Sequence, residues 1–88
     1  MTTLSGRILV HGEPAKNATV ELHNAGGDVV DQIQVDEEGK YTYHLSPGEW
    51  SLNVWDAYGH RGVAQLTLGE DDDKVLDVDL EEPEGGHG

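Results

Sequence analysis

The fold is decided by the stretch Leu45-Ser-Pro-Gly-Glu-Trp-Ser-Leu-Asn-Val54. Pro47 fixes its own φ and Gly48 tolerates positive φ, so the Ser-Pro-Gly triplet predicts a tight turn between two strands. After the turn, apolar and polar residues alternate, which is typical of a strand with one buried face. We therefore expect a strand here, with the indole of Trp50 as the largest single piece of the core and its N–H bonded to a partner.

The same alternation recurs along the chain. It gives seven strand candidates, which cover residues 4–10, 18–22, 29–35, 41–45, 50–54, 64–68 and 76–80. Gly or Pro stands in every segment between them, where the chain has to turn. No window follows the 3.6-residue period of a helix. Strands at this spacing predict an all-β fold, a seven-stranded antiparallel Ig-like β-sandwich with no helix.

Composition sets limits on function. A chain of 88 residues allows one small domain with a modest core, and without cysteine it has no disulfide, thiolate metal site or thiol nucleophile. Eighteen acids against five Lys and Arg give a net charge of −13. This charge excludes ordinary electrostatic binding to nucleic acid or to an anionic membrane. The sequence shows neither an apolar span nor a secretory signal, so we expect no membrane contact and no independent secretion.

The acidity is concentrated toward the C-terminus, where residues 70–88 carry nine acids and one base. Three interpretations are open: a solvated surface with an acidic tail, adaptation to high salt, or a docking face for a basic partner. We predict a single domain over residues 1–82. Residues 83–88 are acidic and Gly-rich without periodicity, which predicts a flexible tail.

Several motifs between residues 6 and 59 resemble those of a known family. They are Gly6, Gly12-Glu-Pro14, Ala18-Thr-Val-Glu-Leu22, Asp36-Glu-Glu-Gly-Lys-Tyr41 and the stretch quoted above. Together they resemble the carboxypeptidase regulatory-like domains of the prealbumin-like (transthyretin-like) group, in particular the small stand-alone members of actinobacteria and their phages. The resemblance implies a prealbumin-like sandwich and a non-catalytic module that binds or spaces.

The sequence carries no motif for catalysis. It has no Gly-x-Gly-x-x-Gly, phosphate loop, His-Glu-x-x-His or Gly-x-Ser-x-Gly pattern. The prealbumin-like group does include an enzyme, the hydroxyisourate hydrolase, whose pocket needs a C-terminal Tyr-Arg-Gly-Ser. This chain ends Gly85-Gly-His-Gly88 instead. We therefore expect neither enzymatic activity nor a cofactor.

One end of the predicted sandwich gathers several potential metal ligands. Antiparallel strands reverse direction, so alternate loops meet at the same end. The best candidates there are His11, His60, Asp36 and Asp56. Imidazole and carboxylate groups suit a transition metal, but these residues lack ligand spacing and scattered histidines are more often surface residues. We predict no metal site.

Trp55 and Tyr58 are the predicted anchors for a protein partner. Alternation places Trp55 on the face opposite the core, and Tyr58 lies in the following turn. Asp71, Asp72 and Asp73 are predicted to steer the encounter. The leading hypothesis is a non-catalytic module that docks on a larger assembly such as a phage capsid or tail. The alternatives are a cytoplasmic accessory subunit of a bacterial sulfur-transfer enzyme, and a carrier of a small molecule or metal. The expected location is the virion or the cytoplasm.

Overall fold

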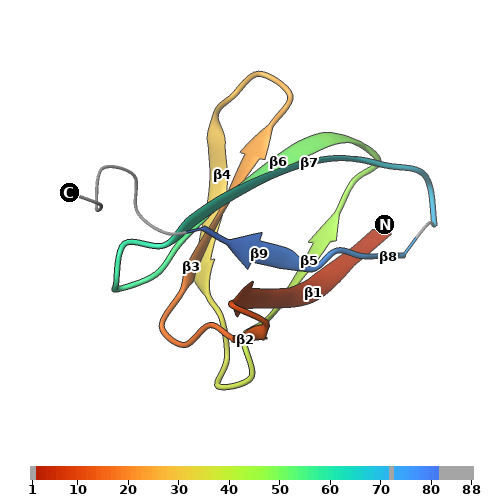
Figure 1. Ribbon diagram of the computed structural model, residues 1–88. Coiled ribbons are helices and arrows are strands. Elements are labelled where there is room, and N and C mark those ends of the chain that lie inside the picture. The colour runs from red at the N-terminus through yellow and green to blue at the C-terminus, as the bar shows by residue number, and fades with distance from the viewer. Residues whose placement is uncertain (1, 72, 82–88) are drawn as a thin grey trace.

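A computed structural model describes residues 2–71 and 73–81 of the chain. These residues form nine strands and no helix, and hence no helix that could cross a membrane (Figure 1). In chain order the strands are β1 (Thr2–Val10), β2 (Glu13–Pro14), β3 (Thr19–Asn24), β4 (Val29–Gln34), β5 (Lys40–Leu45), β6 (Gly48–Trp55), β7 (Arg61–Leu68), β8 (Lys74–Val75) and β9 (Val78–Leu80).

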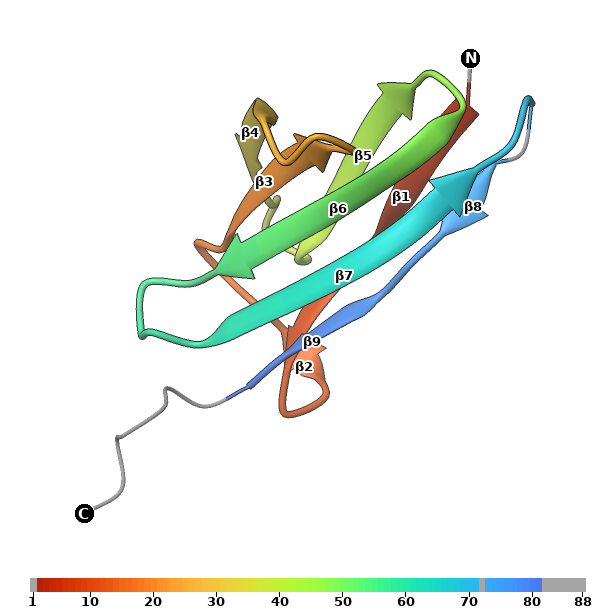
Figure 2. The same ribbon diagram turned by 90° about the horizontal axis from the view of Figure 1, so that it is seen from above.

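The strands form two sheets that pack against each other (Figures 1 and 2). One sheet is antiparallel throughout and has the order β4-β3-β6-β7. The other is built around β1, which pairs antiparallel with β2 and β5 and parallel with β8 and β9. The predicted all-β sandwich without a helix is confirmed, and each of the seven predicted runs contains a strand.

The predicted strand count is wrong, and so is the prediction that every strand pair is antiparallel, because β8 and β9 pair parallel with β1. The described residues form two short strands more than the seven predicted. One of them, β2, exists because His11 and Gly12 both have positive φ (54° and 81°), which is the two-residue turn that closes tight hairpins. The other, β8, begins the parallel pairing with β1. The hydroxyl of Thr2 donates to the carbonyl of Gly69 at 2.7 Å, so the chain that returns from β7 starts beside the beginning of β1 and runs in its direction.

The core lies between the two sheets. Trp50 is not its largest piece, as the sequence predicted, but is half-buried at its margin. The reason is that Trp50 pairs with Asn24 at the end of β3, where the sandwich ends. Its indole N–H donates to the carbonyl of Ser46 at 2.9 Å. The buried apolar residues are Leu4, Ile8, Ala15, Ala18, Val20, Leu22, Tyr41, Tyr43, Leu45, Leu52, Val54, Leu66, Leu68, Val78 and Leu80.

The returning chain crosses β1 at Gly6. The amide of Leu76 donates to the carbonyl of Ser5 at 2.7 Å, and the hydroxyl of Tyr41 donates to the carbonyl of Leu76 at 2.6 Å. A Cβ atom on Gly6 would lie 1.8 Å from that same carbonyl oxygen. The crossing therefore requires a residue without a side chain at position 6.

Two further contacts hold the returning chain. Between β8 and β9, Oδ1 of Asp77 accepts the amide of Arg7 at 3.0 Å, so a side chain replaces a carbonyl of the interrupted ladder. Beyond β9, Glu81 and Arg61 exchange two backbone hydrogen bonds, of 2.8 and 3.1 Å. Because Arg61 begins β7, this bridge ties the last strand of one sheet to the edge of the other. The sandwich is thus closed along this side (Figure 2).

We predict that Gly6→Ala destabilises the fold strongly, by about 2–3 kcal/mol, because the new methyl group displaces Leu76 from β1. Gly26→Ala is the matched control. Its Cβ would approach nothing closer than 3.4 Å, so a change within about 0.5 kcal/mol is expected. Urea denaturation of both variants gives the comparison. Equal stability of the two variants would show that the crossing is not tight.

Candidate functional site

Three hairpin loops share one five-residue geometry. They are Asn24–Asp28, Asp36–Lys40 and Asp56–His60. In each, Oδ1 of the first residue accepts the amides of the third and fifth residues at 2.8–3.0 Å. The fourth residue is a glycine with positive φ, at Gly27, Gly39 and Gly59. We predicted only a generic turn for each loop, although the pattern Asx-x-x-Gly-x is visible in the sequence.

This loop geometry gives a structural role to the two carboxylates that were candidate metal ligands. Asp36 and Asp56 each hold the backbone of their own loop. Hydrogen bonds from the backbone of Lys40 and Glu38 keep the pKa of the Asp36 carboxyl below its ordinary value. Within residues 2–71 and 73–81, no group of three or more His, Asp or Glu side chains is placed to hold a metal ion.

His11 and His60 do come together at one end of the sandwich, as predicted. Their rings meet edge to face with centroids 6.1 Å apart. Nδ1 of His60 lies 2.7 Å from Oδ2 of Asp56, and both side chains are largely buried. Burial opposes ionisation of Asp56, but hydrogen bonds from His60 and from the amide of Tyr58 outweigh it, so the pKa of this carboxyl lies below its ordinary value. Asp56 therefore fixes both the backbone of the loop and the ring of His60.

The two predicted anchors lie on the same hairpin but in different surroundings. Tyr58 is 76% exposed in the loop between β6 and β7. Trp55 lies on the outer face of the sheet, half-buried, with Thr19 of β3 on one side and Arg61 of β7 on the other. Val63, 70% exposed, follows on β7. The hairpin thus presents an exposed aromatic residue at its tip and a more sheltered one on its face.

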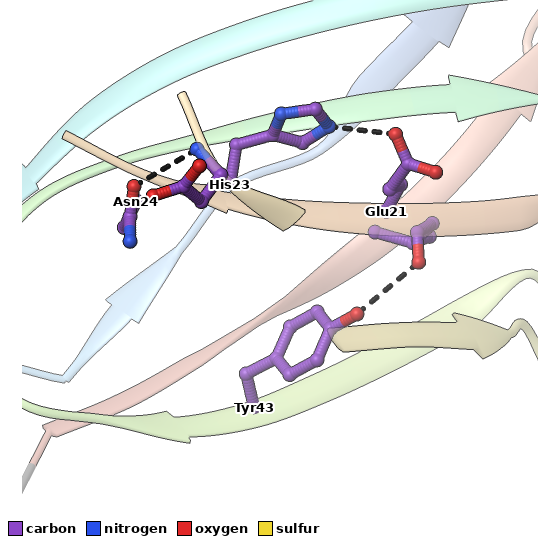
Figure 3. Close-up of polar contacts among 6 residues, drawn as sticks. Glu21, His23, Asn24 and Tyr43 are labelled. Carbon is purple, nitrogen blue, oxygen red and sulfur yellow. Dashed lines mark hydrogen bonds and ion pairs between the residues drawn. The ribbon is translucent and has the colours of Figure 1, made fainter. Parts of the chain in front are cut away.

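Figure 3 shows the polar contacts on the two sides of β3. On the outer face, Nε2 of His23 lies 2.7 Å from Oε1 of Glu21, with both side chains about one-fifth exposed. On the inner side, the hydroxyl of Tyr43 donates to the carbonyl of Val20 at 3.2 Å. Burial, with the charge of Asp31, raises the pKa of Tyr43 to about 12. This hydroxyl is therefore a protonated part of the core, and only the outer face of β3 offers polar groups to a ligand.

Two of the predicted acidic steering residues, Asp71 and Asp73, lie at the other end of the sandwich, in the loop after β7. Oδ1 of Asp73 accepts the amide of Thr3 at 3.1 Å, so this carboxylate helps to hold the start of β1. Asp71 is exposed and has positive φ (52°). Asp72, like the predicted tail at 83–88, lies outside the described residues. The acidic loop and Tyr58 therefore do not share one surface.

The model of the carboxypeptidase regulatory-like domain family matches residues 3–81. This chain belongs to that family. The match confirms the resemblance to carboxypeptidase regulatory-like domains and extends it through the last strand. The likeness to stand-alone members of actinobacteria and their phages stays a prediction. No curated protein matches the chain.

Two solved structures are similar to this carboxypeptidase regulatory-like domain. A DUF3823 family protein from Bacteroides ovatus gives a TM-score of 0.71 at 19% identity, with 91% of this chain and 45% of that chain covered. A DUF3823 family protein from Parabacteroides merdae gives 0.65 at 17% identity, with 90% and 45% covered. The domain spans less than half the length of either protein. Likeness at these identities shows the fold alone.

For this domain we predict that Asp56→Ala lowers the free energy of unfolding by about 2 kcal/mol, because three partly buried hydrogen bonds of this carboxylate are lost. Asp56→Asn is expected to cost less, since Asn24 shows that an amide oxygen supports the same loop. The stability that Asp56→Asn still loses comes from the missing negative charge beside His60.

The stability contributed by the charge of Asp56 depends on pH. The folded pKa of Asp56 lies below the ordinary value of 3.8, so its ionisation stabilises the fold above that value and the gain is lost as pH falls through the folded pKa. The gap between wild type and Asp56→Asn in urea denaturation is therefore expected to close below pH 3.8. Asn24→Ala, in the loop without a histidine partner, is the control. A gap that stays constant with pH would contradict this role of the charge.

Proposed function

We propose that this chain is a non-catalytic docking module and that its β6–β7 hairpin contacts the partner. The observation that carries the proposal is the exposed ring of Tyr58 on a loop whose backbone is fixed by Asp56. A large aromatic side chain on a rigid support loses little conformational entropy on binding. Tyrosine is also among the residues that dominate binding energy at protein interfaces.

The partner is a protein with a basic surface. The net charge of −13 favours such a partner during the encounter, while the apolar contact at Tyr58 and Val63 supplies affinity. The phage capsid or tail predicted from the sequence stays a prediction, because the two similar structures named above are bacterial proteins and show no link to a phage. Attachment to a bacterial enzyme fits the same surface.

We predict that Tyr58→Ala leaves folding intact and weakens partner binding by about 2 kcal/mol, roughly thirtyfold. Val75→Ala is the matched control, because Val75 is 74% exposed on the other sheet. The measurement is retention of lysate proteins from the source organism on immobilised wild type and on each variant.

A partner retained equally by wild type and by Tyr58→Ala, but lost with Val75→Ala, would place the interface on the other sheet. For a partner identified in this way, Asp71→Lys tests the steering role. It is expected to change the association rate and leave the dissociation rate nearly unchanged. A change confined to the dissociation rate would show that the acidic loop is part of the contact itself.

A further inference from the structure

The outer face of the β4-β3-β6-β7 sheet carries a shallow depression around Trp55. Its volume is about 420 Å³, and it is lined by Glu21, Asn53, Trp55, Asp56, Gly59 and Arg61. The register explains how these residues meet: Trp55 lies opposite Arg61, and Asn53 lies opposite Glu21 in the next row. Directly opposed side chains in a sheet have their Cβ atoms about 5 Å apart, so these four form one contiguous group.

The depression combines the partly buried indole of Trp55 with three kinds of hydrogen-bonding group. The carboxylate of Glu21 accepts hydrogen bonds only, and its Oε1 is held 2.7 Å from Nε2 of His23 (Figure 3). The guanidinium of Arg61 donates only, and it forms no ion pair with any other residue of 2–71 or 73–81. The amide of Asn53 does both. The ligand must therefore offer both donors and acceptors around an apolar face.

The charges narrow the choice of ligand. Asp56 also lines the depression, but both oxygens of its carboxylate are bonded within their own loop. The charged groups that a ligand can reach are therefore Glu21 and Arg61. Their opposite charges cancel over the site as a whole, so it favours neither a cation nor an anion that covers it. A single zwitterionic amino acid does not span the site. Glu21 and Arg61 lie two strands apart and two residues apart along the strands, or roughly 12 Å between their Cα atoms. A neutral ligand rich in hydroxyl groups satisfies both walls, because each hydroxyl donates and accepts.

We propose that this depression is a binding subsite for a neutral oligosaccharide. The weakly positive C–H groups on one side of a pyranose ring meet the negative face of the Trp55 indole, while neighbouring hydroxyls bond to Glu21, Asn53 and Arg61. The same face continues beyond Glu21 to Gln32 of β4, its partner in the register, so a second sugar unit has a polar neighbour. The subsite does not rest on the docking proposal, because Tyr58 is not among its lining residues.

Titration of the ¹⁵N-labelled full chain in two-dimensional NMR tests this proposal. The probes are linear hexasaccharides of glucose, xylose and mannose, with trilysine, triglutamate and triglycine as charged and zwitterionic comparisons. We expect at least one hexasaccharide to shift the indole N–H signal of Trp55 and the amides of Asn53 and Arg61. The indole signal of Trp50, on the opposite side of β6, serves as an internal control and is expected to stay in place.

Variants separate this subsite from the docking hairpin. Trp55→Ala is expected to weaken the binding of the responding hexasaccharide at least tenfold, and Trp55→Phe to recover part of the affinity. Tyr58→Ala is the matched control on the same hairpin and is expected to leave sugar affinity unchanged. Should Trp55→Ala fail to fold, Glu21→Gln gives the same test, since it keeps the shape of the side chain and removes its charge.

Three results would overturn the proposal: no shift with any hexasaccharide, a response to a charged or zwitterionic probe alone, or sugar affinity unchanged in a folded Trp55→Ala. Loss of protein docking in Tyr58→Ala with sugar binding retained would support both proposals separately. Loss of sugar binding in Tyr58→Ala would move the subsite to the tip of the loop and contradict its assignment to the sheet face.

Discussion

The close passage of the Leu76 carbonyl over Gly6 is the constraint on which the rest of the sandwich depends. It lets the end of the chain lie along β1 in the parallel direction. From there Val78 and Leu80 enter the core, and Glu81 reaches Arg61 at the start of β7. One strand therefore seals the core and joins the two sheets. Among the described residues, the bridge between Arg61 and Glu81 is the one β-bridge that links a strand of one sheet to the chain of the other.

The two long sides of the sandwich differ as a consequence. The side closed by β9 is the one from which the β6–β7 hairpin emerges, so this hairpin has a fixed base as well as a fixed loop. The opposite side ends at β4, an open edge with two exposed valines, Val29 and Val30. A bulge interrupts the pairing of β4 with β3. Beside it, Oδ1 of Asp31 accepts a hydrogen bond from the amide of Gln32 at 2.8 Å. Both devices discourage pairing of this edge with another chain.

The alternation of apolar residues was enough to predict the sandwich, the strands and most inward-facing residues, because each is a local property of a strand. It did not predict which strands would be neighbours. The parallel return over Gly6 depends on residues seventy positions apart. Trp50 was misplaced because alternation gives the face of a residue and not its depth near the end of a strand. At the candidate site, the aromatic residues of the hairpin were found from the sequence. Glu21 and Arg61 were not, because only the sheet register brings them to Trp55.

Native-state hydrogen exchange at the amides of Arg7, Leu76 and Glu81 tests most directly whether the last strand holds the sandwich together. Each of these amides donates to a contact made by the returning chain. If that chain closes the fold, all three exchange with the free energy of global unfolding, as the central amides of β6 do. Exchange of these three amides at a clearly lower free energy, while β6 stays protected, would contradict the account. It would show a last strand that opens on its own above an intact core.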